Sequence, residues 1–355
     1  MAQDLTILHR PFESDTGFGW RKSLPLLRLL ADDGAGPCRS PLRLYENGQP
    51  LTRPHCQTWW IRTAGCGLYS HRENHLRFSA SDNSNPNENG REYAYGLSAE
   101  PDDPKRFQAQ NRLMPELCQH IAMSAQSGFT LTRQKRILDF GCGDGAFVYT
   151  WRDLGFDAYG FDIHDTLCQR SGEDRKYFRF FEGSRADSWD CRLEDLHIPF
   201  EDDFFDFAFS LCTLEHVKNL DLAMAELARV LKPGALSFHV YVPRYVLVDP
   251  HTRVPLGGVF QGRAYLLACA LAGIRNEFQK GLSARETMRH NARYLEAGLN
   301  YVAPSVMLSV CRRYFSKAAF VPQLRDFGGR SFVYKTLPYK LWAHHTRLSV
   351  LRLWK

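Results

Sequence analysis

The stretch ILDFGCGDGAF, residues 137–147, constrains the fold of this chain more than any other part of the sequence. An apolar run carries Asp139, and the residues that follow, Gly141, Gly143 and Ala146, fit the G-x-G-x-x-A spacing of a dinucleotide-binding turn. Glycines let a ligand approach the backbone closely, and the start of the next helix offers unpaired N–H groups. The stretch therefore predicts a strand, a ligand-binding turn and a helix.

The segments after this turn alternate between strand and helix. Apolar runs predict strands at 136–140, 157–163, about 189–193, 204–211 and 235–242, and TRLSVLRLW predicts a last strand at 346–354. A helix is expected over 220–231, where LKPG stops it. Strands separated by helices are typical of a doubly wound, mostly parallel sheet with helices on both faces.

The first 103 residues have a different pattern. Asn47-Gly48 lies between two strand-like runs, which predicts a hairpin because this turn requires positive φ at both central residues. TWWIRT, residues 58–63, is a further strand candidate. We therefore predict a β-rich accessory segment over residues 1–103.

A helical stretch from Pro104 to about Ser127 opens the second predicted domain. This domain covers 104–355 and contains a cofactor-binding core at 135–243, a helical substrate lid at about 250–315 and final strands at 316–355.

The charge of Asp139 bears on the identity of the cofactor. A carboxylate two places before Gly141 would repel a diphosphate, whereas it would pair with a cation such as the ammonium of a methionine moiety. Asp162 ends the second predicted strand, where an acid accepts both hydroxyls of an unphosphorylated ribose. NAD would use Asp162 equally well, so Asp139 is the residue that disfavours an NAD-dependent dehydrogenase.

Four linked motifs carry a resemblance to a known family. ILDFGCGDG, GFDI, LHIPFEDDFFDFAFSLCTLEHV and ELARVLKPGAL follow one another over residues 135–243. In order and spacing they resemble the class I S-adenosylmethionine-dependent methyltransferases, in the subgroup that reads LPF, FD, LEH and RVLKPG; Ala235 stands where that subgroup has a further glycine. The resemblance implies a Rossmann-like fold with a seven-stranded sheet, and S-adenosyl-L-methionine as cofactor.

The resemblance also implies roles for individual residues. Gly141 and Gly143 would line the methionine portion of the cofactor, Asp139 would hold its ammonium, and Asp162 its ribose. An acid would approach the adenine amine, and spacing does not decide between Glu194 and Asp195. The implied cofactor-binding residues are Asp139, Gly141, Cys142, Gly143, Asp162, Ile163, Glu194, Asp195 and Leu211.

Two histidines are candidates for the catalytic base. Methyl transfer from a sulfonium is an in-line displacement, so alignment supplies most of the rate, and a hydroxyl nucleophile also needs a base within reach. His216, in LEHV, follows the fourth predicted strand, and His251 follows the fifth. Both are therefore expected at the carboxyl edge of the sheet, where ligands bind. No spacing typical of a metal site is evident, and no metal ligand is predicted.

The acceptor is indicated less directly. Residues 42–93 resemble a segment of bacterial proteins of surface-polysaccharide biosynthesis, and an aromatic platform of Trp59, Trp60, Tyr69 and Tyr93 would suit a sugar. The preferred interpretation is O-methylation of a sugar or glycan precursor. Two alternatives stay open: methylation of a lipid or quinone-like small molecule at a membrane surface, and a cofactor-binding scaffold without catalysis.

Charge is distributed unevenly along the chain. The formal net charge is +6, but residues 251–355 hold 17 Lys and Arg against four acids. This excess favours an anionic or lipid-linked acceptor and peripheral membrane contact through the C-terminal part. Ten cysteines without a C-x-x-C pair favour reduced thiols and a cytoplasmic location. A nucleic acid partner is not expected, because SLCTLEH lacks the Asn/Asp-Pro-Pro-aromatic motif of nucleobase methylation.

Overall fold

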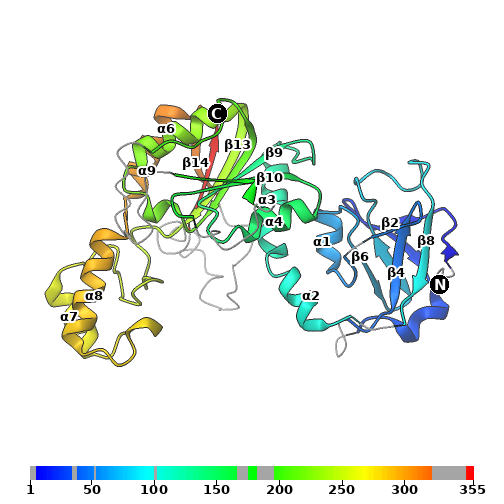
Figure 1. Cartoon of the computed structure of the whole chain (residues 1–355), viewed down its shortest axis with the longest axis horizontal. Coiled ribbons are helices and arrows are strands. Elements are labelled where there is room, and N and C mark those ends of the chain that lie inside the picture. The colour runs from blue at the N-terminus through cyan, green and yellow to red at the C-terminus, as the bar shows by residue number, and fades with distance from the viewer. Residues whose placement is uncertain are drawn as a thin grey trace. The chain divides into compact units, whose positions relative to one another are not determined.

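The computed structural model of the chain contains two compact units, each described here by itself (Figure 1). The first comprises Met1–Arg133 with Thr150–Gly155, and the second Gln134–Tyr149 with Phe156–Lys355. The residues that the structure describes are 5–33, 38–51, 53–99, 102–165, 175–181, 196–321 and 349–355.

A seven-stranded mixed sheet forms the centre of the second unit (Figure 1). Its strands lie in the order β11-β10-β9-β12-β13-β15-β14. All run parallel except β15, which pairs antiparallel with both β13 and β14. Their bounds are β9 Arg136–Phe140, β10 Asp157–Asp162, β11 Phe178–Phe180, β12 Phe205–Leu211, β13 Leu231–Tyr241, β14 Lys317–Val321 and β15 Ser349–Trp354.

This strand order confirms the predicted Rossmann-like methyltransferase fold. In chain order the strands read 3-2-1-4-5-7-6, so the winding direction reverses between β9 and β12. In open α/β sheets ligands bind outside the carboxyl ends of the strands at such a reversal. The fold therefore directs attention to the residues that follow Phe140 and Leu211.

One observed strand of the sheet was not predicted, and one predicted strand is not tested. The third strand of the sheet is β11, which the sequence reading missed; the segment at 189–193 lies outside the described residues. β11 has only three residues, and charged Arg179 stands between its two phenylalanines, so periodicity alone does not reveal it. The last strand, β15, confirms the prediction for 346–354.

Helix α4, Ala146–Asp153, begins in the second unit, and its residues from Thr150 on are grouped with the first. The other helices of the second unit are α6 Leu220–Val230, α7 Arg263–Leu271, α8 Ala284–Ala297 and α9 Pro304–Tyr314, with 3₁₀ turns η2 Leu214–His216 and η3 Glu277–Gln279. Because Met224 and Leu227 lie on one face of α6, that face packs into the main core together with Met307 of α9. Asn219 caps α6 by accepting a hydrogen bond from the backbone N–H of Leu222.

Helices α7 and α8 build a smaller core of their own (Figure 1). Val254, Leu266, Leu295 and Tyr301 are buried together in it. Ser283 starts α8 with a capping box in which Glu286 returns a hydrogen bond to the Ser283 backbone. This core anchors the segment that carries His251.

The first unit contains two four-stranded antiparallel sheets, in the orders β1-β8-β4-β5 and β2-β3-β7-β6. Asn47 and Gly48 take φ values of 50° and 74° between β4 and β5, which confirms the predicted hairpin. The elements are β1 Thr6–Ile7, β2 Glu13–Ser14, β3 Trp20–Ser23, η1 Pro25–Leu30, β4 Leu42–Glu46, β5 Gln49–Pro50, α1 Thr58–Thr63, β6 Tyr69–Arg72, β7 His75–Phe78, β8 Tyr93–Leu97, α2 Pro104–Gln110 and α3 Met114–Gln126.

The strand predicted for TWWIRT is wrong, because residues 58–63 form helix α1. Consecutive Trp60 and Ile61 are both buried, and Ala64 at the end of the helix is buried as well. A half-buried strand would instead alternate buried and exposed positions. Tertiary packing has therefore overridden the β propensity of the tryptophans.

Helices α2 and α3 group with the first unit, so the compact division falls at Arg133, 30 residues beyond the predicted boundary at residue 103. Within the described ranges, every helix is too short or too polar to cross a lipid bilayer.

Candidate functional site

The turn after β9 has the backbone geometry that a close ligand requires. Gly141 and Gly143 have φ values of +83° and +51°, in the left-handed region that glycine adopts most easily. The N–H groups of Gly141 and Cys142 both donate to the carbonyl of Phe161 at the end of β10, at 2.8 and 3.1 Å. A Cβ on Gly141 would lie 2.3 Å from the side chain of Thr213, whereas a Cβ on Gly143 would meet nothing within 4 Å. The turn is thus closed on the sheet side and open at Gly143.

Asp139 lies beneath this turn as a buried carboxyl. It is 3% exposed, and its Oδ2 atom has no hydrogen-bond partner among the described residues. Burial, reinforced by the negative charges of Asp162 and Asp144, raises the pKa of Asp139 well above its usual range. When it is ionised, this buried carboxylate would pair with a cationic ligand group and would repel the diphosphate of a dinucleotide.

Asp162 has a structural role that the sequence did not reveal. Its Oδ2 accepts the N–H of Gly143 at 2.8 Å, and its Oδ1 accepts the N–H of His164 at 3.1 Å. The carboxylate therefore holds the glycine turn to the end of β10. Each oxygen keeps a second lone pair, so the ribose contact implied by the resemblance stays possible.

The structure describes three of the other predicted cofactor residues and leaves two outside the described ranges. Cys142 is buried and packs against Gly160, while Ile163 and Leu211 are partly exposed next to the carboxyl ends of β10 and β12. Glu194 and Asp195 lie outside the described residues. The described residues fit S-adenosyl-L-methionine, because they combine an open glycine turn with a buried acceptor for its ammonium.

A second cluster lies after β12 and β13. The structure brings the two predicted histidines together: the ring centroids of His216 and His251 are 5.1 Å apart and the rings are nearly perpendicular. Glu215 joins them, so that one ligand atom from each of the three residues lies within 4.8 Å of the others. The sequence reading missed Glu215, although it stands beside His216 in LEHV.

Glu215 is almost completely buried. The residue is only 1% exposed to solvent, and neither carboxylate oxygen has a hydrogen-bond partner within the described ranges. Burial raises the pKa of Glu215 to about 7. A backbone bond from Asn300 to the Glu215 carbonyl, at 2.6 Å, ties this position to the segment after α8.

Fixed acceptors orient both imidazole rings. Nδ1 of His216 donates to the carbonyl of Gly298 at 2.8 Å, because a carbonyl can only accept. Nδ1 of His251 lies 3.1 Å from the hydroxyl of Tyr301, which itself donates to Asp249 Oδ2 at 2.6 Å. Each ring therefore carries its proton on Nδ1 and has a lone pair on Nε2 (an assignment from partners).

Burial lowers the pKa of His216, so its ring is neutral near pH 7. Burial alone would raise the pKa of Asp249, but hydrogen bonds from His251, Tyr301 and the backbone of Thr252 lower it. The cluster thus combines the neutral imidazole of His216 with an ionised aspartate behind His251.

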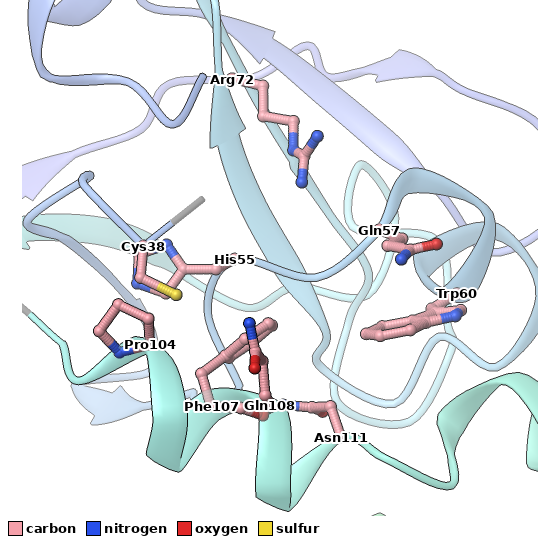
Figure 2. A pocket seen from close by; sticks show the side chains of 9 residues that line it. All are labelled: Cys38, His55, Gln57, Trp60, Arg72, Pro104, Phe107, Gln108 and Asn111. Carbon is pink, nitrogen blue, oxygen red and sulfur yellow. Dashed lines mark hydrogen bonds between the residues drawn. The ribbon is translucent and has the colours of Figure 1, made fainter. Parts of the chain in front are cut away.

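The first unit has a separate pocket of about 280 Å³ (Figure 2). Trp60 and Phe107 supply aromatic surface, and Arg72, Gln108 and Asn111 supply polar groups. Trp60 is the only residue of the predicted aromatic platform in its lining. The platform as a whole is wrong, because the side chains of Tyr69 and Tyr93 belong to the core between the strands. The pocket combines an aromatic wall with amide groups, a mixture suited to a small polar ligand.

His55, at the edge of this pocket, is held between two acids. Its Nδ1 lies 2.8 Å from Asp32 Oδ2, and its Nε2 lies 2.6 Å from Asp102 Oδ2. Burial alone would lower the pKa of His55, but the hydrogen bonds and charges of the two aspartates raise it. The imidazolium therefore links Asp32 to Asp102.

The raised pKa gives the stability of the first unit a defined pH dependence. When the pKa of a histidine is higher in the folded state than its unfolded value of about 6.5, the histidine stabilises the folded state. This contribution is complete below a pH of about 6.5 and is lost as the pH rises through the folded pKa. We expect hydrogen exchange of β4 and β6 amides to accelerate above about pH 6.5 more in the wild type than in His55→Gln. His9→Gln, at an exposed site, should behave as the wild type. Equal pH profiles for His55→Gln and wild type would contradict this prediction.

Comparisons with known proteins agree with this geometry. Residues 138–238 match the family described as Methyltransferase domain. Sterol 4-C-methyltransferase strm-1 of Caenorhabditis elegans is 31% identical over 140 residues, which are 39% of this chain and 39% of that protein. Malonyl-[acyl-carrier protein] O-methyltransferase of Erwinia pyrifoliae is 32% identical over 124 residues, 33% of this chain and 43% of that protein.

A solved S-adenosylmethionine dependent methyltransferase from Mesorhizobium loti covers 66% of this chain and 96% of its own, with 17% identity and a TM-score of 0.38. The chain spans less than half the length of the two curated relatives. The matched residues include the glycine turn, Asp139, Asp162 and the Glu215–His216 pair. Residues 138–238 are therefore similar to a methyltransferase domain.

Proposed function

We propose that the chain transfers a methyl group from S-adenosyl-L-methionine to a hydroxyl oxygen of a sugar or glycan precursor. The observation that carries this proposal is the Glu215–His216–His251 cluster at the carboxyl edge of the sheet. A hydroxyl is a weak nucleophile until its proton is removed, and the cluster brings one nitrogen or oxygen atom from each of three titratable side chains within 4.8 Å of the others.

In the sequence, the cluster begins just after a residue that contacts the glycine turn. Thr213 stands two residues before Glu215, and its side chain occupies the space where a Cβ of Gly141 would lie. The residue that contacts the cofactor-binding turn thus stands two positions before the first residue of the cluster, at the edge where the winding of the sheet reverses, and methyl transfer requires the two sites to be close.

Each residue then has a definite part in the reaction. The bound cofactor supplies a methyl group on a positively charged sulfur, which is already an activated leaving group. Asp139 would accept hydrogen bonds from the cofactor ammonium, and Asp162 from its ribose. Nε2 of His251 can take the proton of the acceptor hydroxyl, and Asp249 behind the ring would stabilise the resulting imidazolium.

The pocket of the first unit, taken by itself, has a lining that suits a sugar. Trp60 offers an aromatic surface, and Gln108 and Asn111 offer amides that hydrogen-bond hydroxyls. Sugars present both an apolar ring face and many hydroxyls, so this lining matches them in chemistry. The similarity of residues 42–93 to polysaccharide-biosynthesis proteins points in the same direction.

A lipid or quinone-like acceptor at a membrane surface is the second candidate. Leu271, at the end of α7, and Phe278, in η3, are 72% and 80% exposed. Cationic Arg275 and Lys280 flank Phe278 in the sequence. Exposed apolar and basic side chains together are typical of peripheral membrane contact. The sterol substrate in the name of the nematode relative also favours this class.

A labelled-methyl assay tests the proposal. Purified protein with methyl-labelled S-adenosyl-L-methionine is incubated with cell-envelope glycan extracts, lipid extracts and RNA. We expect label in the glycan arm, in a product that resists alkaline hydrolysis as an ether does. Label confined to the lipid arm would support the second candidate. Cofactor binding without label in any arm would contradict both and indicate a non-catalytic scaffold.

A further inference from the structure

We propose that Glu215, His216 and His251 form a binding site for one divalent transition-metal ion, of the class of Zn²⁺, Mn²⁺ or Co²⁺. Two imidazoles and one carboxylate are a donor set that such ions prefer. The sequence analysis placed both histidines at one edge of the sheet but predicted no metal ligand, because His251 stands 35 residues beyond His216 and no metal-site spacing is evident.

The distances suit capture of one ion. The three ligand atoms lie within 4.8 Å of one another, and ligands around a tetrahedral ion at 2.0–2.1 Å are about 3.4 Å apart. Small side-chain rotations therefore complete the site. Because the two rings are nearly perpendicular, with an interplanar angle of 86°, their nitrogens can approach an ion from different directions.

Both imidazoles are already prepared as ligands. Metal-binding histidines almost always donate their other ring N–H to a carbonyl or carboxylate, which fixes the tautomer and orients the ring. His216 does this with the carbonyl of Gly298. His251 does it with Tyr301, whose hydroxyl is in turn fixed by Asp249. The lone pair of each Nε2 is thus left for a metal ion.

Glu215 supplies the observation that most requires a cation. It is 1% exposed, and both carboxylate oxygens lack a hydrogen-bond partner in the part of the chain that the structure describes. A buried carboxylate without partners is strongly unfavourable, and coordination to a metal ion removes that penalty.

The ion would have a role in the proposed reaction. Three protein ligands leave a coordination position open, which an acceptor hydroxyl could fill. Coordination lowers the pKa of the hydroxyl, so that its proton passes more easily to solvent before oxygen attacks the methyl group. With the ion bound, Nε2 of His251 is a ligand and no longer acts as the base. This role rests on the proposed function, whereas binding of the ion does not.

Metal binding by the purified full-length chain tests the site. The protein is stripped with a chelator, loaded with Co²⁺ or Zn²⁺, freed of excess ion by gel filtration and analysed for bound metal. We expect one ion per chain and, with Co²⁺, the intense visible bands of low coordination number. Glu215→Gln and His251→Gln should each weaken binding at least about 10-fold.

His197→Gln is the matched control. His197 also pairs with a glutamate, with Nδ1 2.9 Å from Glu226 Oε2, but it is exposed and outside the cluster. We expect this variant to bind Co²⁺ as the wild type does. Tyr301→Phe, which removes only the group behind His251, should weaken binding about 10- to 100-fold and keeps the test valid if Glu215→Gln fails to fold.

Three results would overturn the site: no bound ion in the wild type, equal binding in the cluster variants, or equal loss in His197→Gln. Bound ion without methyl transfer to any extract would refute the proposed function and leave the site standing. Methyl transfer by a chain that binds no ion would refute the metal site and leave the proposed function standing.

Discussion

Replacing Glu215 by glutamine should lower the turnover of methyl transfer by at least about 100-fold. Glutamine keeps the size of the buried side chain but removes its negative charge. The charge is needed whether Glu215 accepts the hydroxyl proton itself or holds a metal ion that activates the hydroxyl. The affinity for S-adenosyl-L-methionine should change by less than about twofold, because the proposed cofactor contacts are those of Asp139 and Asp162.

Single-turnover measurements with saturating labelled cofactor separate these two effects, and equilibrium dialysis gives the cofactor affinity. Glu296→Gln is the matched control, since Glu296 is an exposed glutamate of α8. Its turnover should equal that of the wild type. Unchanged turnover in Glu215→Gln would show that a buried, unpartnered carboxylate beside two histidines has no part in the chemistry.

The sequence predicted the elements whose pattern is local. The glycine turn, the hairpin at Asn47-Gly48 and helix α6 follow from short-range rules on φ angles and on apolar spacing. The positions of His216 and His251 at one edge of the sheet followed from the rule that parallel strands share their carboxyl ends. Their approach to 5.1 Å agrees with that reasoning.

The features that were missed depend on contacts between distant segments. Glu215 differs from an ordinary turn acid in its burial, and nothing in LEHV reports that burial. Asp162 was expected to serve the ribose alone, yet its bond to the Gly143 N–H depends on the turn folding back onto β10. Helix α1 formed where two tryptophans indicated a strand, because Trp60 and Ile61 are both buried.

Replacing Asp139 by asparagine should change stability and cofactor binding in opposite directions. The folded pKa of Asp139 is raised above the unfolded value of about 3.9, so the folded state binds more protons than the unfolded state between these two values. The free energy of unfolding of the cofactor-free wild type therefore falls as pH rises from about 4 toward the folded pKa. Asparagine does not titrate, so the variant should lack this loss and be the more stable protein near pH 7.

Cofactor binding should show the opposite preference. The cofactor ammonium requires an ionised acceptor, so a protonated Asp139 must release its proton when the cofactor binds. The affinity of the wild type should then rise up to about tenfold per pH unit until pH passes the folded pKa. Asp139→Asn should bind the cofactor about 10- to 100-fold more weakly near pH 7 and lose that pH dependence.

Denaturant unfolding without cofactor and calorimetric titration with S-adenosyl-L-methionine, both at several pH values, measure the two effects. Asp144→Asn is the control: Asp144 is exposed on the same turn, and asparagine can still accept the N–H of Ala146 as Asp144 does at 3.1 Å. This variant should keep the pH dependence of binding. If Asp139→Asn bound the cofactor as tightly as the wild type at every pH, the ammonium would have to be held elsewhere, and the buried carboxyl would have no part in distinguishing a sulfonium nucleoside from a dinucleotide.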